Sequence, residues 1–576
     1  MRATRSRLPQ AIAVLVLAAA SAVRGAPSPI GAAAPLVLYT DLVSGPNLGG
    51  ENGQGAYLSI FGKHFGGAGL GTRLKVYIGG AEVAAYRYLG PSRGRPDIEQ
   101  ISVQVGRLGD PRPGVPLPIE VMVNGVPSNT DTTFTVNPGR ILFVDNVRGN
   151  DRRAVVGDIR RPFRHVQTPD LFEGAWGEAR PGDIIVMRGS GTPWTDLGFE
   201  QYFLRFRNKS GSPPNGRRGT GPIVIMGYPG EDVYIRGTLS GGMMGGCISA
   251  INGVSYPGIG QWAVIADLRI DCEGYDGPIS EEIHGNHWRV INNDLSASTA
   301  PTSGPHVPRM AGITGNGYDS VWLGNHIHDI QGSPQEAHGI YIDADGSYDI
   351  GYNLIENIRS GNGFQTYSNG TNGSDTIGHV RFHHNLIRGV SKHGINLADG
   401  TREDIVIYDN VVYRTACSGI RLNTTGLVDA RIYDNTFYDT DTTHNPHCGA
   451  ISNDWNLPAQ ALVLSNNVFE PADGTAYLAG SVGFADFPGT ASNNLFFGGS
   501  GPTLGQPAQS ANPLFVDPAN GDFHVASGSP AIGAGAAATL AAPTDYDLNA
   551  RAPGRSDIGA FAYTGVRPAA RPAASR

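Results

Sequence analysis

The sequence predicts an all-β protein in two parts, a small antiparallel β-sandwich followed by a long stack of repeated coils. Glycine is abundant, with 81 residues, and charged residues make up only 16% of the chain, which is typical of turn-rich β-structure. Short alternating strands fill the first part, and a motif that recurs every 25 to 32 residues fills the second. A period in this range indicates stacked structural units. The 576 residues also exceed what one compact core usually holds.

Residues 1–25 have the pattern of a secretory signal peptide. Three arginines lie among the first seven residues, an apolar run covers residues 11–20, and small residues follow up to Gly25. We therefore expect a secreted protein, located in the periplasm, outside the cell or on its surface. No later apolar run is long enough to span a membrane. Residues 26–35 are rich in alanine and proline and are predicted to form a linker.

The predicted mature chain is acidic. Removing residues 1–25 takes away four arginines and no acid, which lowers the formal net charge from −8 to −12. This balance disfavours nucleic acid as a partner. It leaves an acidic polysaccharide open, because a local basic groove can act within a negative whole.

The segment 36–138 alternates short apolar strands with Gly, Pro and Asn turns, which predicts a small antiparallel β-sandwich. Its runs LSIFGKHFG, VYIGG, PIEVMVNGVPS and FTV resemble an IPT/TIG domain, an immunoglobulin-like module. Such modules usually space or bind, so the resemblance implies a non-catalytic role for this part.

The segment 139–500 begins with a strand, a turn, a short helix expected within residues 169–178, and a further strand. The stretches PFRHVQ and PGDIIVMRG resemble the entry segment of bacterial proteins of the pectate-lyase-like superfamily. The resemblance implies a right-handed parallel β-helix whose open end is capped by the short helix. Residues 501–565 resemble the terminal segment of such proteins, so we expect them to cover the far end. Residues 566–576 are predicted to be disordered.

An asparagine recurs through these coils. A second series of glycine–apolar pairs, such as GIY, GFQ, GIN and GIR, alternates with it, so each coil supplies at least two short strands. Asparagines at a bend can stack on their equivalents and hydrogen bond the backbone along the pile. The eight asparagines are Asn293, Asn325, Asn353, Asn385, Asn410, Asn435, Asn467 and Asn494.

Four cysteines in an exported chain allow two disulfides. Cys417 and Cys448 each lie three residues before an isoleucine of the repeat, so we expect them to lie on neighbouring coils and to pair. Cys247 and Cys272 would then pair by elimination.

Chemistry has to be sought among outward side chains, because this fold alone does not give function. Side chains of a β-strand alternate between its two faces. If Ile340, Ile395 and Ile420 point inward, the residues adjacent to them in each strand therefore point outward. Successive coils then present one mixed polar face, formed by Tyr341, Asp343, Gln365, Tyr367, Lys392, Asn396, Arg421 and Asn423.

This face suits β-elimination in a uronate polymer, in which the carboxylate is neutralised, the C5 proton is removed and the C4 oxygen leaves. We expect Lys392 to be the base and Arg421 to clamp the carboxylate or donate a proton. Asp343 and Asp345 are the best candidates for a Ca²⁺ site. The array is similar in kind to that of β-helical lyases acting on alginate or chondroitin-type chains, but no segment matches their catalytic motif.

The remaining polar residues of the face are candidates for substrate binding. Tyr341 and Tyr367 could stack on sugar rings, and Gln365, Asn396 and Asn423 could hydrogen bond the sugar. For Lys392 and Arg421 a plain solvated surface is the alternative, and for Asp343 and Asp345 a simple turn before Gly346.

His338 and His393 occupy equivalent places, each just before the Gly–Ile of a coil. They form either a proton-transfer pair or a pair of turn histidines hydrogen bonded to the backbone. The HNPHC stretch at residues 444–448 has metal-like spacing but no second matched cluster, so no zinc site is expected there.

The leading hypothesis is a secreted lyase acting on an acidic polysaccharide such as alginate or pectate. A glycoside hydrolase would need two carboxylates roughly 5–9.5 Å apart, which Asp343 could form with Asp345 or Asp399. A C5-epimerase shares the proton abstraction and stays open. So does a non-catalytic adhesin or glycan-binding protein of the cell surface.

Overall fold

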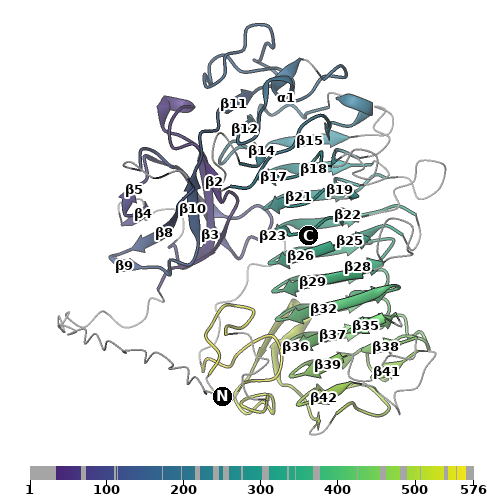
Figure 1. Cartoon of the computed structure of the whole chain (residues 1–576). Coiled ribbons are helices and arrows are strands. Elements are labelled where there is room, and N and C mark those ends of the chain that lie inside the picture. Colours follow the sequence, from purple (N-terminus) through teal and green to yellow (C-terminus); the bar gives the residue numbers. More distant parts are fainter. Residues whose placement is uncertain are drawn as a thin grey trace, which may run out of the picture.

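The protein is seen in a computed structural model as a tall stack of strands with a small sandwich against one side (Figure 1). The structure describes residues 34–565, with gaps at 67–72, 109–111, 113, 172, 196–197, 215–220, 238–245, 251–257, 274–276, 284, 301–310, 334–335, 344–345, 368–375, 425, 455–461, 481–488, 506–507, 537–542, 553 and 555. The predicted signal peptide and disordered tail lie outside these residues. Within them, no helix combines the length and the apolar character needed to cross a membrane.

The N-terminal unit is a two-sheet sandwich, as predicted for this segment. One sheet has the order β1 (Leu36–Thr40), β3 (Tyr57–Lys63), β7 (Glu99–Gln104) and β6 (Ala85–Pro91). The other has the order β2 (Ser44–Gly45), β10 (Thr133–Val136), β8 (Pro116–Val123), β4 (Leu74–Ile78) and β5 (Ala81–Glu82), with β9 (Val126–Pro127) beside β8. All pairings are antiparallel except that between β10 and β2. The IPT/TIG resemblance of this unit stays a prediction.

The rest of the chain winds into a parallel β-helix with three long sheets, which confirms the predicted fold class. The first sheet contains β11 (Ile141–Val144), β12 (Ile184–Met187), β14 (Ile223–Gly227), β17 (Ala263–Ala266), β20 (Arg289–Ile291), β23 (Ser320–Leu323), β26 (Gly346–Gly351), β29 (Thr376–His383), β32 (Thr401–Tyr408), β36 (Ala430–Tyr433), β39 (Leu462–Ser465) and β42 (Thr490–Ser492), with β35 (Gly426–Val428) beside β32.

The second sheet contains β15 (Tyr234–Gly237), β18 (Arg269–Cys272), β21 (Asp294–Ala297), β24 (His326–Ile330), β27 (Leu354–Ile358), β30 (Leu386–Val390), β33 (Val411–Thr415), β37 (Thr436–Thr440), β40 (Val468–Pro471), β43 (Leu495–Phe496) and β44 (Gln509–Ser510). The third contains β13 (Leu204–Phe206), β16 (Ile248–Ala250), β19 (Ile279–Ile283), β22 (Ala311–Asn316), β25 (His338–Asp343), β28 (Phe364–Tyr367), β31 (Ile395–Ala398), β34 (Ile420–Asn423), β38 (Ile451–Asn453) and β41 (Leu478–Ala479).

One continuous apolar core fills the stack, because each strand turns its alternate residues inward. Ile340, Phe364 and Ile395, for example, are completely buried and stand in register on adjacent strands. Burying a side chain of this size stabilises the fold by about 1.5–3 kcal/mol. The repeat therefore preserves an apolar residue at each inward position.

The eight repeat asparagines form an unbroken ladder at the bend between the first and second sheets. Each backbone N–H donates to the side-chain oxygen of the next asparagine, as from Asn325 to Asn353 at 2.9 Å. The amide nitrogen of Asn325 also donates to the carbonyl of Val290, at 2.9 Å. All eight side chains are fully buried. The expected stacking of these residues is confirmed.

Both predicted disulfides, Cys417–Cys448 and Cys247–Cys272, are present. The N-terminal helix α1 (Gly174–Glu178) is shorter than the expected range and turns the buried Trp176 onto Phe206. Short 3₁₀ turns also occupy Glu51–Gly53, Phe199–Gln201 and Pro518–Asn520.

The sandwich packs on the outer face of the first sheet. Its core is continuous with outward residues of that sheet, including Phe143, Met226 and Leu323. Polar contacts fix the junction, since Asn292 accepts a hydrogen bond from the backbone of Gly94 at 2.9 Å. Both faces of this part of the parallel sheet are thereby covered.

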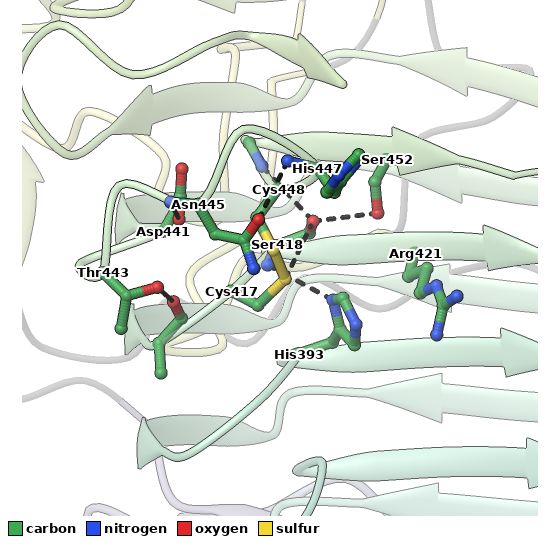
Figure 2. Close-up of a disulfide and its surroundings, with 12 residues drawn as sticks. His393, Cys417, Ser418, Arg421, Asp441, Thr443, Asn445, His447, Cys448 and Ser452 are labelled. Carbon is green, nitrogen blue, oxygen red and sulfur yellow. Dashed lines mark hydrogen bonds between the residues drawn. A yellow bond between two sulfur atoms is a disulfide. The ribbon is translucent and has the colours of Figure 1, made fainter. Parts of the chain in front are cut away.

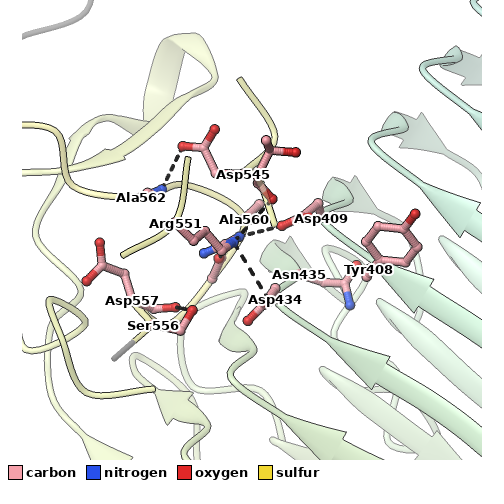
Figure 3. Close-up of polar contacts among 12 residues, drawn as sticks. Tyr408, Asp409, Asp434, Asn435, Asp545, Arg551, Ser556, Asp557, Ala560 and Ala562 are labelled. Atoms are coloured by element: carbon pink, nitrogen blue, oxygen red, sulfur yellow. Dashed lines mark hydrogen bonds and ion pairs between the residues drawn. The ribbon is translucent and has the colours of Figure 1, made fainter. Parts of the chain in front are cut away.

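The C-terminal segment lies along the side of the stack, whereas we expected it to cover the far end (Figure 1). Its hairpin of β45 (Phe515–Asp517) and β46 (Asp522–Val525) and the residues after it pack on outward residues of the second sheet, among them Val411, Tyr413 and Val468. Buried Arg551 fastens the segment by ion pairs with the fully buried Asp409 and Asp434 (Figure 3).

Candidate active site

Four residues of the predicted polar face form a continuous row on the third sheet, whereas Lys392 lies in the turn before β31. Parallel pairing of β25, β28, β31 and β34 puts Tyr341, Gln365, Asn396 and Arg421 directly in register. Two residues further along the strands, Asp343 aligns with Tyr367, and Ala398 aligns with Asn423. Strands in a sheet lie about 4.8 Å apart, so Tyr341 and Arg421, 80 positions apart in sequence, lie roughly 14 Å apart on one wall.

The middle of this row is held by a small amide network. The side-chain oxygen of Gln365 accepts from the amide nitrogen of Asn396 at 2.9 Å and from that of Asn362 at 2.5 Å. Asn396 is 4% exposed, whereas Gln365 keeps more exposure. The network therefore fixes the orientation of donors and acceptors beneath any bound sugar.

An aromatic run lies at the β25 and β28 end of the face. The ring of Tyr341 stacks on His338, with centroids 5.5 Å apart, and on Tyr367 at 6.5 Å. Tyr341 is 9% exposed, and Tyr367 is half-buried. Of the two rings that we expected to stack on sugars, Tyr367 presents more surface.

Two cations lie at the β31 and β34 end. Burial lowers the pKa of Lys392, and the positive charge of Arg421 lowers it further. Arg421 donates from its Nε to Asp454, 2.7 Å away, so part of its charge is already balanced. A depressed ammonium pKa makes the neutral amine, which can accept a proton, easier to reach near neutral pH.

Lys392 is also unusual for this chain, in which only four of the 43 Lys and Arg residues are lysines. The other three are Lys63 and Lys75 in the sandwich and Lys209, which donates to carbonyls at the end of α1. Surfaces elsewhere carry arginine. A lysine beside the polar row is therefore poorly explained as one of many solvating charges.

His338 and His393 belong to a second ladder, at the turn before each third-sheet strand. The Nδ1 of His338 accepts from the backbone N–H of Asn362 at 3.0 Å, and the Nδ1 of His393 accepts from that of Ser418 at 3.2 Å. Between them, the side-chain oxygen of Asn362 accepts from the backbone of His393 at 3.0 Å. Since Nδ1 accepts a hydrogen bond in each ring, it carries no proton, and the proton of the neutral imidazole lies on Nε2.

Burial, together with the positive charge of Lys392, lowers the pKa of His338 to about 3. Burial, together with the charges of Arg421 and Lys392, lowers the pKa of His393 to about 3 as well. The geometry supports turn histidines hydrogen bonded to the backbone over a proton-transfer pair, because neither ring readily gains a second proton. Asn362 precedes a glycine–apolar pair as the histidines do, and this shared place in the repeat could have identified it.

The Cys417–Cys448 disulfide closes the same end of the face. It joins the turn before β34 to the turn before β38, beside Ser418, His393 and Arg421 (Figure 2). The hydroxyl of Ser418 is also hydrogen bonded to that of Ser452, at 2.8 Å. These links hold the coil that carries Arg421 against the next coil, which supplies Asp454.

The predicted Ca²⁺ site stays a prediction. Asp343 is half-buried at the end of β25, and Asp345 lies outside the described residues. Asp399, the other carboxylate considered for a hydrolase, lies in the turn after β31 and donates its backbone N–H to Asn423 at 2.9 Å.

Asp454 was not predicted from sequence, because it becomes a partner of Arg421 only through strand register. The same holds for a cluster on the second sheet, formed by Asp294, His326 and His328.

Comparison with known proteins finds only distant similarity. No protein-family model and no curated protein matches the chain. Among solved structures, a family 28 exopolygalacturonase from Yersinia enterocolitica is 11% identical, with a TM-score of 0.40, over 83% of this chain and 95% of that one. A periplasmic alginate epimerase is 12% identical, with a TM-score of 0.22, over 61% of this chain and 64% of that one. At these values the function has to be argued from the site itself.

Proposed function

We propose that the protein is a secreted enzyme that removes the C5 proton of a uronate residue in an acidic polysaccharide and cleaves the chain by β-elimination. The observation that carries the proposal is the placement of Lys392 beside Arg421 at one end of an aligned polar row. Arg421 has a structural partner in Asp454, but nothing in the described part of the stack requires a second cation near it, and burial of Lys392 costs free energy.

In this mechanism Arg421 binds the uronate carboxylate, which stabilises the negative charge that develops when C5 loses its proton. Lys392, as the neutral amine, accepts that proton. The electron pair of the C5–H bond forms the C4–C5 double bond as the C4–O bond breaks, and the departing oxygen takes a proton from the Lys392 ammonium or from water. Asp454 fixes the guanidinium in place. Tyr367 and the amides of Gln365 and Asn396 position the sugar rings along the row.

The test is a panel of alginate, pectate and chondroitin-type polymers, assayed by the ultraviolet absorbance of the unsaturated uronate, with and without a chelator. We expect rising absorbance on at least one polymer, and loss of roughly 10²–10⁴-fold in turnover for Lys392→Ala. Lys75→Ala, an exposed lysine of the sandwich, is the matched control. Loss of activity in the chelated enzyme would support the predicted Ca²⁺.

Other outcomes separate the alternatives. New reducing ends without absorbance would indicate a hydrolase and overturn the elimination. Exchange of the C5 hydrogen without cleavage would indicate an epimerase with the same base. Binding without any chemistry would indicate a glycan-binding protein, and normal turnover by Lys392→Ala would remove that residue from the mechanism.

A further inference from the structure

A second group of potential ligands lies on the second sheet, separate from the face with Lys392. His326 and His328 are two residues apart on β24, so both point outward, while Ile327 between them is fully buried. Asp294, the first residue of β21, is directly in register with His326. Two adjacent coils thus bring two imidazoles and a carboxylate together.

The three side chains are already close to the geometry of a metal site. One oxygen of Asp294 is 3.0 Å from the Nε2 of His328, and the other is 3.7 Å from the Nδ1 of His326. One ligand atom from each residue lies within 4.8 Å of the others. Zinc ligands at about 2.0–2.2 Å from the ion lie about 3–3.5 Å apart, so small side-chain rotations suffice.

The nitrogen of each imidazole that faces away from Asp294 is held by a further carboxylate. The Nε2 of His326 lies 2.8 Å from Glu356, and the Nδ1 of His328 lies 2.9 Å from Asp329. Such carboxylate–histidine pairs fix the ring and its tautomer in metal sites. A merely solvated histidine pair has no need of an oriented partner on both sides.

The outer carboxylates are themselves positioned by arginines. Arg388 pairs with Glu356, and Arg359 pairs with Asp329. Counting Asp294, three carboxylates face two guanidinium groups, so the two imidazoles are left to balance the third carboxylate, and a bound cation would take over that role from their protons. The three inner side chains are each 20–23% exposed, which leaves room for an ion to enter and for water to complete its coordination.

We propose that Asp294, His326 and His328 bind a divalent transition-metal ion, with Zn²⁺ preferred, and that the ion clamps the coil of β21 to the coil of β24. Two nitrogen donors and one oxygen donor suit Zn²⁺ and its late first-row neighbours, whereas Ca²⁺ and Mg²⁺ prefer oxygen donors alone. This site is independent of the elimination chemistry and of the predicted Ca²⁺ site.

The test uses the mature protein, stripped with a chelator and then titrated with Zn²⁺ by calorimetry, with Co²⁺ as a spectroscopic probe. We expect one equivalent to bind, the Co²⁺ absorption of a mixed nitrogen–oxygen site, and a higher thermal midpoint with Zn²⁺. His326→Ala and His328→Ala should each weaken binding by about 100-fold or more, and Glu356→Gln by about 10–100-fold.

The controls are His379→Ala, which removes an exposed histidine paired with Asp404, and His444→Ala with His447→Ala in the exposed HNPHC stretch. All should bind Zn²⁺ as the parent does. If an alanine variant fails to fold, Asp294→Asn keeps the shape of the cluster and should still lose the ion. Absence of stoichiometric binding, or equal binding by the His326 and His328 variants, would overturn the proposal.

Discussion

Two polar ladders run along this β-helix, and they differ in composition. The ladder between the first and second sheets is asparagine at every step, from Asn293 to Asn494. The ladder before the third sheet changes residue at every step, through His338, Asn362, His393 and Ser418, to the backbone of Gly449. Both ladders supply an acceptor for the backbone of a neighbouring coil, which is the preceding coil in the asparagine ladder and the next coil in the mixed ladder.

The difference teaches where the repeat is constrained. The asparagine side chains are enclosed on all sides, and each amide, as at Asn325, donates two hydrogen bonds and accepts two. An imidazole or a hydroxyl has only one hydrogen to donate and cannot replace it. The mixed ladder needs only an acceptor. It can therefore vary, and it lies beside the face that carries Lys392 and Arg421.

The largest expected effect comes from breaking the uniform ladder. Asn410→Ala removes an acceptor for the backbone of Asn385 and a donor to the carbonyl of Phe382. Each buried group left unsatisfied costs about 1–3 kcal/mol, so we expect a loss of roughly 3–5 kcal/mol in the free energy of unfolding. Urea denaturation measures it, with the exposed Asn520→Ala as control. A loss below about 1 kcal/mol would show that the ladder is not needed for stability.

A second effect separates the ladders by pH. The folded pKa of His338 and His393 is about 3, against an ordinary value of 6.5. Their stabilising contribution is therefore complete above pH 6.5 and is lost as the pH falls from 6.5 toward 3. When the pH is lowered from 7 to 5, we expect each histidine to reduce the free energy of unfolding by on the order of 1–2 kcal/mol.

The double variant His338→Asn and His393→Asn tests this assignment, because asparagine already serves at the Asn362 step. Unfolding measured at both pH values should show a smaller acid loss in the variant than in the parent. Other titrating groups are common to both proteins and cancel in the difference. Equal acid sensitivity would mean that the two imidazoles are not the source.

The smallest expected effect comes from removing one hydrogen bond of the mixed ladder at neutral pH. His393→Ala leaves the backbone N–H of Ser418 without its acceptor and should cost about 1–2 kcal/mol. His393→Asn should stay within about 0.5–1 kcal/mol of the parent, since only the acceptor is required. Thermal unfolding of the two variants side by side gives the comparison, and equal losses would mean that ring packing matters more than the hydrogen bond.

Sequence alone predicted the features that repeat. The spacing of Asn410 and Asn435 indicated stacking, the offset of Cys417 and Cys448 indicated a disulfide, and alternation along the strands put Tyr341 and Arg421 in one row. Each of these predictions follows from the period of the repeat and from the alignment of equivalent residues on successive coils.

The remaining features depend on contacts that have no period. The partnership of Asp294 with His326 and His328 requires the register of a different sheet, although two histidines at alternate positions of a strand were a visible signal. The C-terminal segment carries no repeat, and the resemblance that suggested an end cap says nothing of Arg551 or of its buried partners Asp409 and Asp434.

The side position of that segment has a consequence for biogenesis. Outward apolar residues such as Val411, Tyr413 and Val468 are covered by the hairpin and the residues after it. A chain synthesised from its amino end would leave these apolar residues exposed until roughly its last fifty residues have been made and have folded onto them. Premature termination would therefore yield a chain that is prone to aggregate, even though all of its coils have already been synthesised.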